Sequence, residues 1–364
     1  MPQELGRTIH SIDALYDFVY TPELNLRMDQ IEDPFSNSFH WVFDVPIFTQ
    51  GLQVGPQLFW IHGKLGLGKL TWMKFIYKSR HTWDLLHNWR TNVLEIKASF
   101  FFHYRVTAIQ KSFEGVLRSL IAQILRTHMD ALSKTHRLYW DEYQEITGGG
   151  EKARNRYKAF KRSASLKPPF ESFERHGNSQ TLSLLAQIVT EFRSEDRPVL
   201  KLERILRLLL KQDALKMHLV VFFDALDEFD GPLDVISRFL KGLTQASETS
   251  ATRVKVCFSS RPWEPLRAHF SSYPNFALEG YTITEIENYT ASSVADWEVE
   301  NLVIINPAPK VISRANAIFL WVTLAIRVLH EPYLSSPEKV APALMEQKLQ
   351  ELPDDPFDFY KVTI

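Results

Sequence analysis

The stretch Gly63-Lys64-Leu65-Gly66-Leu67-Gly68-Lys69 decides the fold prediction because it joins two different kinds of segment. Before it runs Leu58-Phe59-Trp60-Ile61, an apolar stretch typical of a buried parallel strand, and from Lys69 onward a helix is predicted. The stretch itself fits the pattern G-x-x-x-x-G-K, in which backbone N–H groups turn inward around phosphate oxygens. The sequence therefore predicts a phosphate-binding loop between a strand and a helix.

The candidate phosphate-binding residues all belong to this loop and to the first turn of the predicted helix. The lysine would reach the β- and γ-phosphates as a mobile point charge, and the helix dipole favours anions at this end. The alternative is an ordinary glycine-rich turn with a surface lysine, and the motif alone does not exclude it. The candidates are Gly63, Gly66, Gly68, Lys69, Leu70 and Thr71.

A second group of candidates lies where a very apolar stretch, Leu219–Phe223, ends in Asp224. An aspartate at the carboxyl end of a buried strand can hold Mg²⁺ through water, and a later acid can polarise the attacking water. Asp224 is therefore the candidate metal ligand, and Glu228 is the candidate base with Asp227 as its competitor. The alternative, in which these acids only solvate a loop, leaves the position of Asp224 unexplained.

The third candidate is Arg261, which follows the predicted strand Val254–Phe258 within Ser259-Ser260-Arg261-Pro262. An arginine at this place can sense a γ-phosphate from a neighbouring strand. Taken alone, it is more simply explained as a salt-bridged surface residue. The order and spacing of the loop, the acids and the arginine make the three predictions support one another.

The rest of the chain indicates alternating strands and helices and then helices alone, as an α/β domain followed by a helical subdomain requires. We expect a lead-in at residues 1–56, a nucleotide-binding domain at 57–280 with a mobile insertion near 146–180, and a helical subdomain at 281–364. The basic insertion favours a solvated linker over a nucleic-acid-binding arm. The expected elements are a central strand in Val93–Tyr104, a crossover helix at Ser112–Met129, and C-terminal helical patterns at Thr284–Val294, Val311–Val328 and Pro342–Leu352.

The composition narrows the functional classes. The 364 residues carry a formal net charge of -1, so bulk charge does not predict nucleic-acid binding. A single cysteine, Cys257, excludes an intramolecular disulfide and a cysteine-rich zinc site. The N-terminus lacks a secretory signal, and Ala317–Ile326 is too short to cross a membrane, so we expect a cytoplasmic protein without a membrane span.

Together the three motifs resemble those of the NACHT NTPases, especially the fungal STAND-type proteins linked to heterokaryon incompatibility and innate immunity. The resemblance covers about Ile31 to Pro353. Besides the motifs, it is carried by Phe39–Asp44, Ser99–Phe102, Gln110–Leu120 and Phe319–Val322.

The resemblance implies a three-layer P-loop NTPase core with a parallel sheet, followed by an α-helical subdomain. It also implies a signalling switch between a closed ADP-bound form and an open form that holds ATP or GTP with Mg²⁺. Relatives of this kind carry an effector domain before the core and a sensor after it, through which partner proteins or self-association would act. We therefore expect the helical subdomain to be incomplete and the chain to be truncated.

Four residues or stretches depart from the family pattern. Leu70 stands where the family has a serine or threonine whose hydroxyl coordinates Mg²⁺, and Thr71 would need a shifted helix start to replace it. Leu67 replaces a small polar residue, Ala225 replaces a glycine, and Ala317–Phe319 lacks a proline that touches the base in related switches. The base preference is therefore left open.

These departures leave two main hypotheses. The first is a nucleotide-binding switch core whose Mg²⁺-dependent hydrolysis is slow or impaired. The second is a non-catalytic interaction scaffold that keeps the P-loop fold. Another P-loop enzyme, such as a small-molecule kinase or a transport ATPase, ranks lowest because the acids after Asp224 suit activation of water better than phosphoryl transfer to an alcohol.

Overall fold

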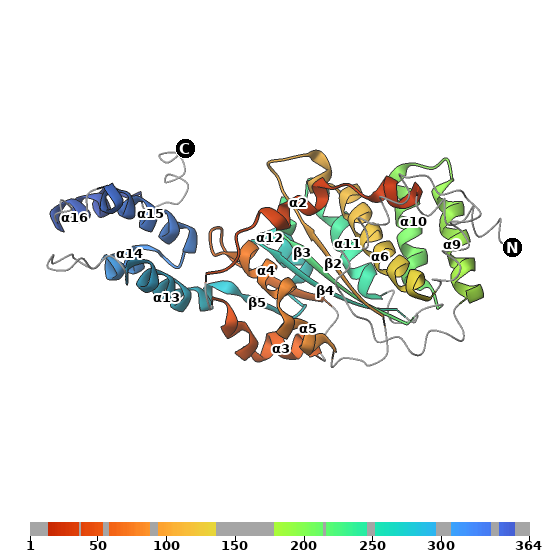
Figure 1. The fold of residues 1–364 in the computed structure, drawn as a ribbon, viewed down its shortest axis with the longest axis horizontal. Coiled ribbons are helices and arrows are strands. Elements are labelled where there is room, and N and C mark those ends of the chain that lie inside the picture. Colours follow the sequence, from red (N-terminus) through yellow and green to blue (C-terminus); the bar gives the residue numbers. More distant parts are fainter. Residues whose placement is uncertain are drawn as a thin grey trace. The chain divides into compact units, whose positions relative to one another are not determined.

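The computed structural model describes nine segments of the chain, and Figure 1 draws the remaining residues as a thin grey trace. The expected insertion near 146–180 lies outside the described residues, apart from 178–180 at the start of a helix. The chain is divided into two compact units. The first comprises Met1–Gln30, Pro56–Leu58 and Leu86–Cys257, and the second comprises Ile31–Gly55, Phe59–Leu85 and Phe258–Ile364. The described segments are 14–35, 38–53, 58–87, 94–135, 178–213, 216–245, 252–295, 307–335 and 342–353.

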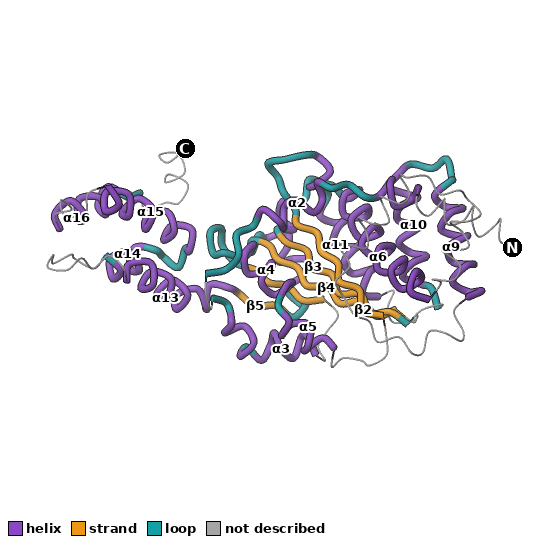
Figure 2. Tube along the Cα trace, in the orientation of Figure 1, coloured by secondary structure: helices purple, strands orange, loops and turns teal. Residues whose placement is uncertain are grey.

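A five-stranded parallel sheet with flanking helices confirms the predicted α/β class, and Figure 2 shows its strands in orange. The strand order is β2-β3-β4-β1-β5. Every residue of β3 is buried, as expected for a strand whose two faces are both covered. The strands are β1 (Leu58–His62), β2 (Leu94–Phe101), β3 (Met217–Asp224), β4 (Thr252–Ser260) and β5 (Asn275–Ala277).

The position of β2 differs from the prediction of a central strand. It stands at one end of the strand order and pairs in parallel with β3, from Leu94 opposite Met217 to Phe101 opposite Asp224. Helices α2 (Glu23–Gln30) and α6 (Phe113–Thr135) pack against it. An apolar strand sequence therefore indicates that both faces of the strand are covered. It does not indicate that the strand has a hydrogen-bonded neighbour on each side.

Three helices of the first unit pack one after another from β2: α6 packs on β2, α10 packs on α6, and α9 packs on α10 (Figure 1). The predicted crossover helix is confirmed as α6, and the next described helices of this unit are α9 (Asn178–Phe192) and α10 (Pro198–Lys211). Within the expected lead-in, residues 14–19 and α2 are helical. The remaining elements of this unit are η2 (Ala108–Lys111), η3 (Leu226–Glu228) and α11 (Leu233–Gln245).

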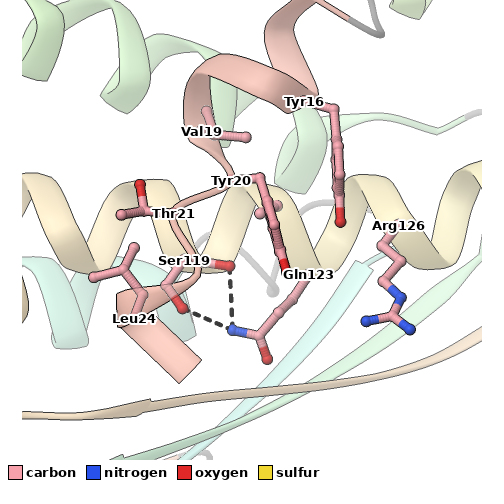
Figure 3. Close-up of a pocket in the computed structure, with 9 residues that line it drawn as sticks. Tyr16, Val19, Tyr20, Thr21, Leu24, Ser119, Gln123 and Arg126 are labelled. Atoms are coloured by element: carbon pink, nitrogen blue, oxygen red, sulfur yellow. Dashed lines mark hydrogen bonds between the residues drawn. The ribbon is translucent and has the colours of Figure 1, made fainter. Parts of the chain in front are cut away.

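Residues 16–24 lie against α6, as Figure 3 shows. Arg118 of α6 donates to the carbonyl oxygen of Phe18, stands 4.2 Å from the centroid of its ring and pairs with Glu114 at 2.7 Å. A pocket of about 20 Å³ lies between the N-terminal segment and α6, which is room for roughly one water molecule. Arg118 therefore helps to anchor the N-terminal segment, together with the buried Leu15, Val19 and Leu24.

The second unit surrounds β1 and the end of β4 with aromatic side chains. Its largest fully buried residues include Trp60, Trp72, Phe48, Phe258 and Phe270. The helix predicted from Lys69 is confirmed as α4 (Lys69–Lys78). Its other elements are η1 (His40–Asp44), α3 (Pro46–Gln53), α5 (Arg80–His87), α12 (Glu264–Phe270) and η4 (Leu278–Tyr281).

The C-terminal part of this unit is helical, as predicted, but the pattern Val311–Val328 forms two helices instead of one. Asn316 and Ala317 both have left-handed backbone conformations, with φ of 47° and 61°, and these end α14 before α15 begins. A hydrophobic cluster that includes Trp321 holds these helices together. Among the described residues, no helix is long and apolar enough to span a membrane. The helices are α13 (Thr282–Val294), α14 (Ala308–Arg314), α15 (Phe319–Ser335) and α16 (Pro342–Glu351).

Lys255 tests whether β4 is as buried as the structure shows. It lies in β4 with 4% of its surface exposed, and this burial lowers its pKa to about 8. The unfolded chain binds this proton up to about pH 10.5, so stability should rise between about pH 8 and 10.5. Lys255→Met should add about 1–3 kcal/mol to the free energy of unfolding at pH 7.

This gain should shrink toward pH 10, as measured by urea denaturation at both pH values. The exposed Lys216 provides the control, because Lys216→Met should change stability little at either pH. A gain for Lys255→Met that stays constant between pH 7 and 10 would contradict the assigned cause.

Candidate functional site

The predicted phosphate-binding loop connects β1 to α4 in the second unit. Gly66 and Gly68 have φ of 81° and 79°, the left-handed region that glycine adopts without strain. Gly68 is the N-cap of α4, and the N–H of Trp72 bonds back to its carbonyl oxygen at 2.9 Å. The backbone therefore has the strand, glycine turn and helix start that a phosphate-binding loop needs.

Each glycine of the loop lies close to a different part of the second unit. A Cβ on Gly63 would stand 2.7 Å from Leu67, and one on Gly66 would stand 2.7 Å from Ile318. One on Gly68 would stand 3.7 Å from Phe39 of the lead-in. Leu67, which replaces a small polar residue of the family pattern, is buried against Gly63 at 1% exposure.

Two hydrogen bonds from outside the motif hold the loop. The N–H of Leu320 donates to the carbonyl oxygen of Gly66 at 2.9 Å. The N–H of Lys64 donates to a carboxylate oxygen of Glu279 at 2.8 Å. Neither contact was predicted, because Glu279 and Leu320 are more than 200 residues away along the chain and no local pattern marks them.

Lys69, Leu70 and Thr71 occupy the first turn of α4. The Nζ of Lys69 donates to the carbonyl oxygens of Gly63 and Lys64 at 2.6 Å each, so the lysine lies along the inside of its own loop. The helix begins at Lys69 without a shift. Leu70 therefore keeps the position directly after the lysine, and the shifted start that would put Thr71 there does not occur.

The end of β4 borders the loop, as the prediction for Arg261 requires. The carbonyl oxygen of Ser260 accepts the N–H of Gly63 at 3.3 Å, and its hydroxyl accepts the indole N–H of Trp60 at 2.8 Å. Ser260 is fully buried, whereas Arg261 is exposed at the strand end. The structure thus brings the arginine and the phosphate loop together within the second unit.

The predicted acids gather in the first unit, at the end of β3. Asp224 is 2% exposed, and its carbonyl oxygen accepts the N–H of Phe102 at 3.1 Å. Asp227 and Glu228 lie in η3, which directly follows. The carboxylate of Glu228 accepts the N–H of Tyr104 at 2.8 Å, a contact that sequence reasoning missed because the donor is a backbone group.

Ala225 adopts a left-handed conformation between Asp224 and η3, with φ 54° and ψ 48°. Its carbonyl oxygen accepts the N–H of Glu228 at 2.8 Å, so this conformation starts the turn that carries the acids. A side chain in the left-handed region costs about 1–2 kcal/mol. The glycine that the sequence resemblance implies at this position would thus have a conformational reason, and alanine meets the geometry at a cost.

Ala225→Gly should raise the free energy of unfolding by about 1 kcal/mol, because glycine removes the left-handed strain. Chemical denaturation of both proteins measures the difference. The matched control is Ala277→Gly at an ordinary φ of -90°, which should lower stability by about 0.5–1 kcal/mol. Equal effects of the two substitutions would contradict the argument.

Similarity to a known family covers the part of the chain that contains the phosphate loop. A family model described as Nephrocystin 3, N-terminal matches residues 37–168, less than half of the chain. The matched range includes β1, the loop, α4 and β2, and it ends before Asp224, Glu228 and Arg261. No curated protein matches the chain at a significant level. The match and the parallel sheet are consistent with a NACHT-associated NTPase region.

Proposed function

We propose that the chain binds the phosphates of ATP or GTP through the loop Gly63–Thr71, as the core of a STAND-type signalling switch. The observation that carries this proposal is the geometry of the loop. Two left-handed glycines lead into a helix that begins at Lys69, whose ammonium group lies against the loop carbonyls. Backbone N–H groups at a helix start and a lysine ammonium group are the donors that a nucleotide phosphate requires.

The switching part of the proposal is supported by the contact between the loop and the helical subdomain. Leu320, at the start of α15, bonds to Gly66, and Ile318 packs on the same glycine. This segment follows the two left-handed residues that separate α14 from α15. Phosphate binding that changes the curvature of the loop would alter this contact and so bias the subdomain. Fungal incompatibility and innate immunity are proposed settings that rest on the sequence resemblance.

Lys69→Ala should weaken binding of ATP and GTP about 10- to 100-fold, because a charge-assisted interaction with phosphate is lost. Titration calorimetry on folded protein measures the dissociation constants. Lys64→Ala provides the matched control in the same loop, since the Lys64 side chain is exposed and its backbone N–H remains. The proposal fails if the wild type and both variants bind nucleotide equally well or not at all.

A second candidate function, a non-catalytic scaffold, is favoured by Leu70. The helix begins without a shift, so a side chain with no lone pair follows Lys69. Mg²⁺ bound with a nucleotide would then depend on phosphate, water and Asp224, the proposed carboxylate ligand. This donor set fits binding better than turnover, and it predicts weak hydrolysis.

Leu70→Ser should raise Mg²⁺-dependent phosphate release about 10-fold or more, because the hydroxyl supplies a metal ligand. Release is measured with and without Mg²⁺ at saturating ATP and GTP. Leu65→Ser is the matched control, since Leu65 is an exposed leucine of the same loop. Substantial turnover by the wild type would exclude the scaffold, and no gain in Leu70→Ser would exclude Leu70 as the cause of weak hydrolysis.

A further inference from the structure

Two loops of the first unit are joined where β2 and β3 end. The N–H of Tyr104 donates to Oε2 of Glu228 at 2.8 Å, and the N–H of Asp230 donates to the carbonyl oxygen of Lys111 at 2.9 Å. The Nζ of Lys111 lies 3.4 Å from a carboxylate oxygen of Asp230 and 4.8 Å from the ring centroid of Tyr104. The segment Tyr104–Lys111, named here the β2 loop, is thus attached on both sides of the candidate base.

The bond from Tyr104 orients the carboxylate of Glu228. A carboxylate has two oxygens, so holding Oε2 on a backbone donor directs the group while Oε1 keeps its capacity to accept a proton. In hydrolysis, the oxygen of a water molecule bonds to the terminal phosphorus, its proton passes to the base, and the nucleoside diphosphate leaves. A base held in one direction makes that proton transfer more efficient.

Gln110 holds the β2 loop from within, with 5% of its surface exposed. Its carbonyl oxygen accepts the N–H of His103 at 3.2 Å, and its Oε1 accepts the hydroxyl of Thr107 at 3.0 Å. Its Nε2 donates to the carbonyl oxygen of Glu23, in α2, at 2.7 Å. The buried side chain therefore ties the loop, at Thr107, to the N-terminal segment, while the backbone of the same residue bonds to the residue that precedes the loop.

We propose that Gln110 is a positioning residue for Glu228. By fixing the β2 loop to α2, it places the N–H of Tyr104 on the Glu228 carboxylate, so Glu228 rather than Asp227 is the base. The inference rests on the proposed nucleotide function. It adds that the N-terminal segment, through Glu23, influences the geometry of the base.

The positioning itself is tested by hydrogen exchange of the Tyr104 amide, resolved at the peptide level, without nucleotide. Glu228→Ala removes the acceptor and should speed exchange about 10-fold. Gln110→Leu should do the same although it leaves the acceptor in place. Gln123→Leu is the matched control, because Gln123 also bonds to backbone in this unit, at Ser99, and should leave Tyr104 protected. Unchanged exchange in Gln110→Leu overturns the inference.

The functional consequence is tested by steady-state kinetics in the Leu70→Ser background. Gln110→Leu should lower kcat about 10-fold and leave KM within about twofold, because binding depends on the phosphate loop. A second pair of variants, at Tyr104, tests the same role if Gln110→Leu does not fold. Tyr104→Pro lacks the N–H and should lower kcat, whereas Tyr104→Phe keeps it and should match the parent, since the ring is 64% exposed.

The outcomes separate this inference from the proposed function. If no variant or parent binds nucleotide, the proposed function fails, and the exchange result still decides whether Gln110 positions Glu228. If the parent turns over nucleotide and Gln110→Leu and Tyr104→Pro keep its kcat, the positioning role fails while nucleotide binding stands. A rise in KM with unchanged kcat also overturns the inference, because that result places Gln110 in binding.

Discussion

The turn between β1 and α4 depends on two residues in the left-handed backbone region, and glycine supplies both. Gly66 and Gly68 bend the chain so that the first turn of α4 opens toward the inside of the loop, where Lys69 lies against the carbonyl oxygens of Gly63 and Lys64. Any other residue would add a Cβ to a conformation that side chains avoid. The candidate phosphate site follows from this constraint.

The same glycines leave room for neighbours to approach the loop closely. Phe39 of the lead-in lies beside Gly68, Leu67 lies over Gly63, and Ile318 packs on Gly66. The lead-in is in turn tied to the helical subdomain, since the N–H of Phe39 donates to the buried carboxylate of Glu285 at 2.7 Å. A change in the loop would therefore alter contacts with two segments, the lead-in before it in the sequence and the helical subdomain after it.

Left-handed residues other than glycine mark further places where the chain accepts strain. Ala225 starts the turn with the acids, and Asn316 with Ala317 forms the break before α15. Such conformations persist only where surrounding contacts hold them. The carbonyl oxygen of Ala225 accepts the N–H of Glu228. After the break, the N–H of Leu320 donates to the carbonyl oxygen of Gly66. Each strained turn thus leads directly into a hydrogen bond of a candidate residue within its own unit, Glu228 in the first and Gly66 in the second.

Sequence alone was sufficient for the features that depend on nearby residues. The strand before Gly63, the helix from Lys69, the strand ending on Asp224 and the parallel α/β class all follow from apolar runs and glycine positions. Sequence alone did not predict that β2 ends the sheet, because an apolar strand is equally suited to any covered position. It also missed β5, which has only three residues, and the break within Val311–Val328, where no glycine or proline marks the turn.

The contacts that organise the candidate site were decided by the tertiary structure alone. Leu320 on Gly66, Glu279 on Lys64 and Tyr104 on Glu228 each join residues more than 100 positions apart. In all three the donor is a backbone N–H, which every residue except proline carries, so residue identity does not encode it. The sequence thus determined which residues are the candidates for holding phosphate and for acting as a base. Only the folded chain determined what holds them, because those partners are selected by geometry rather than by side-chain type.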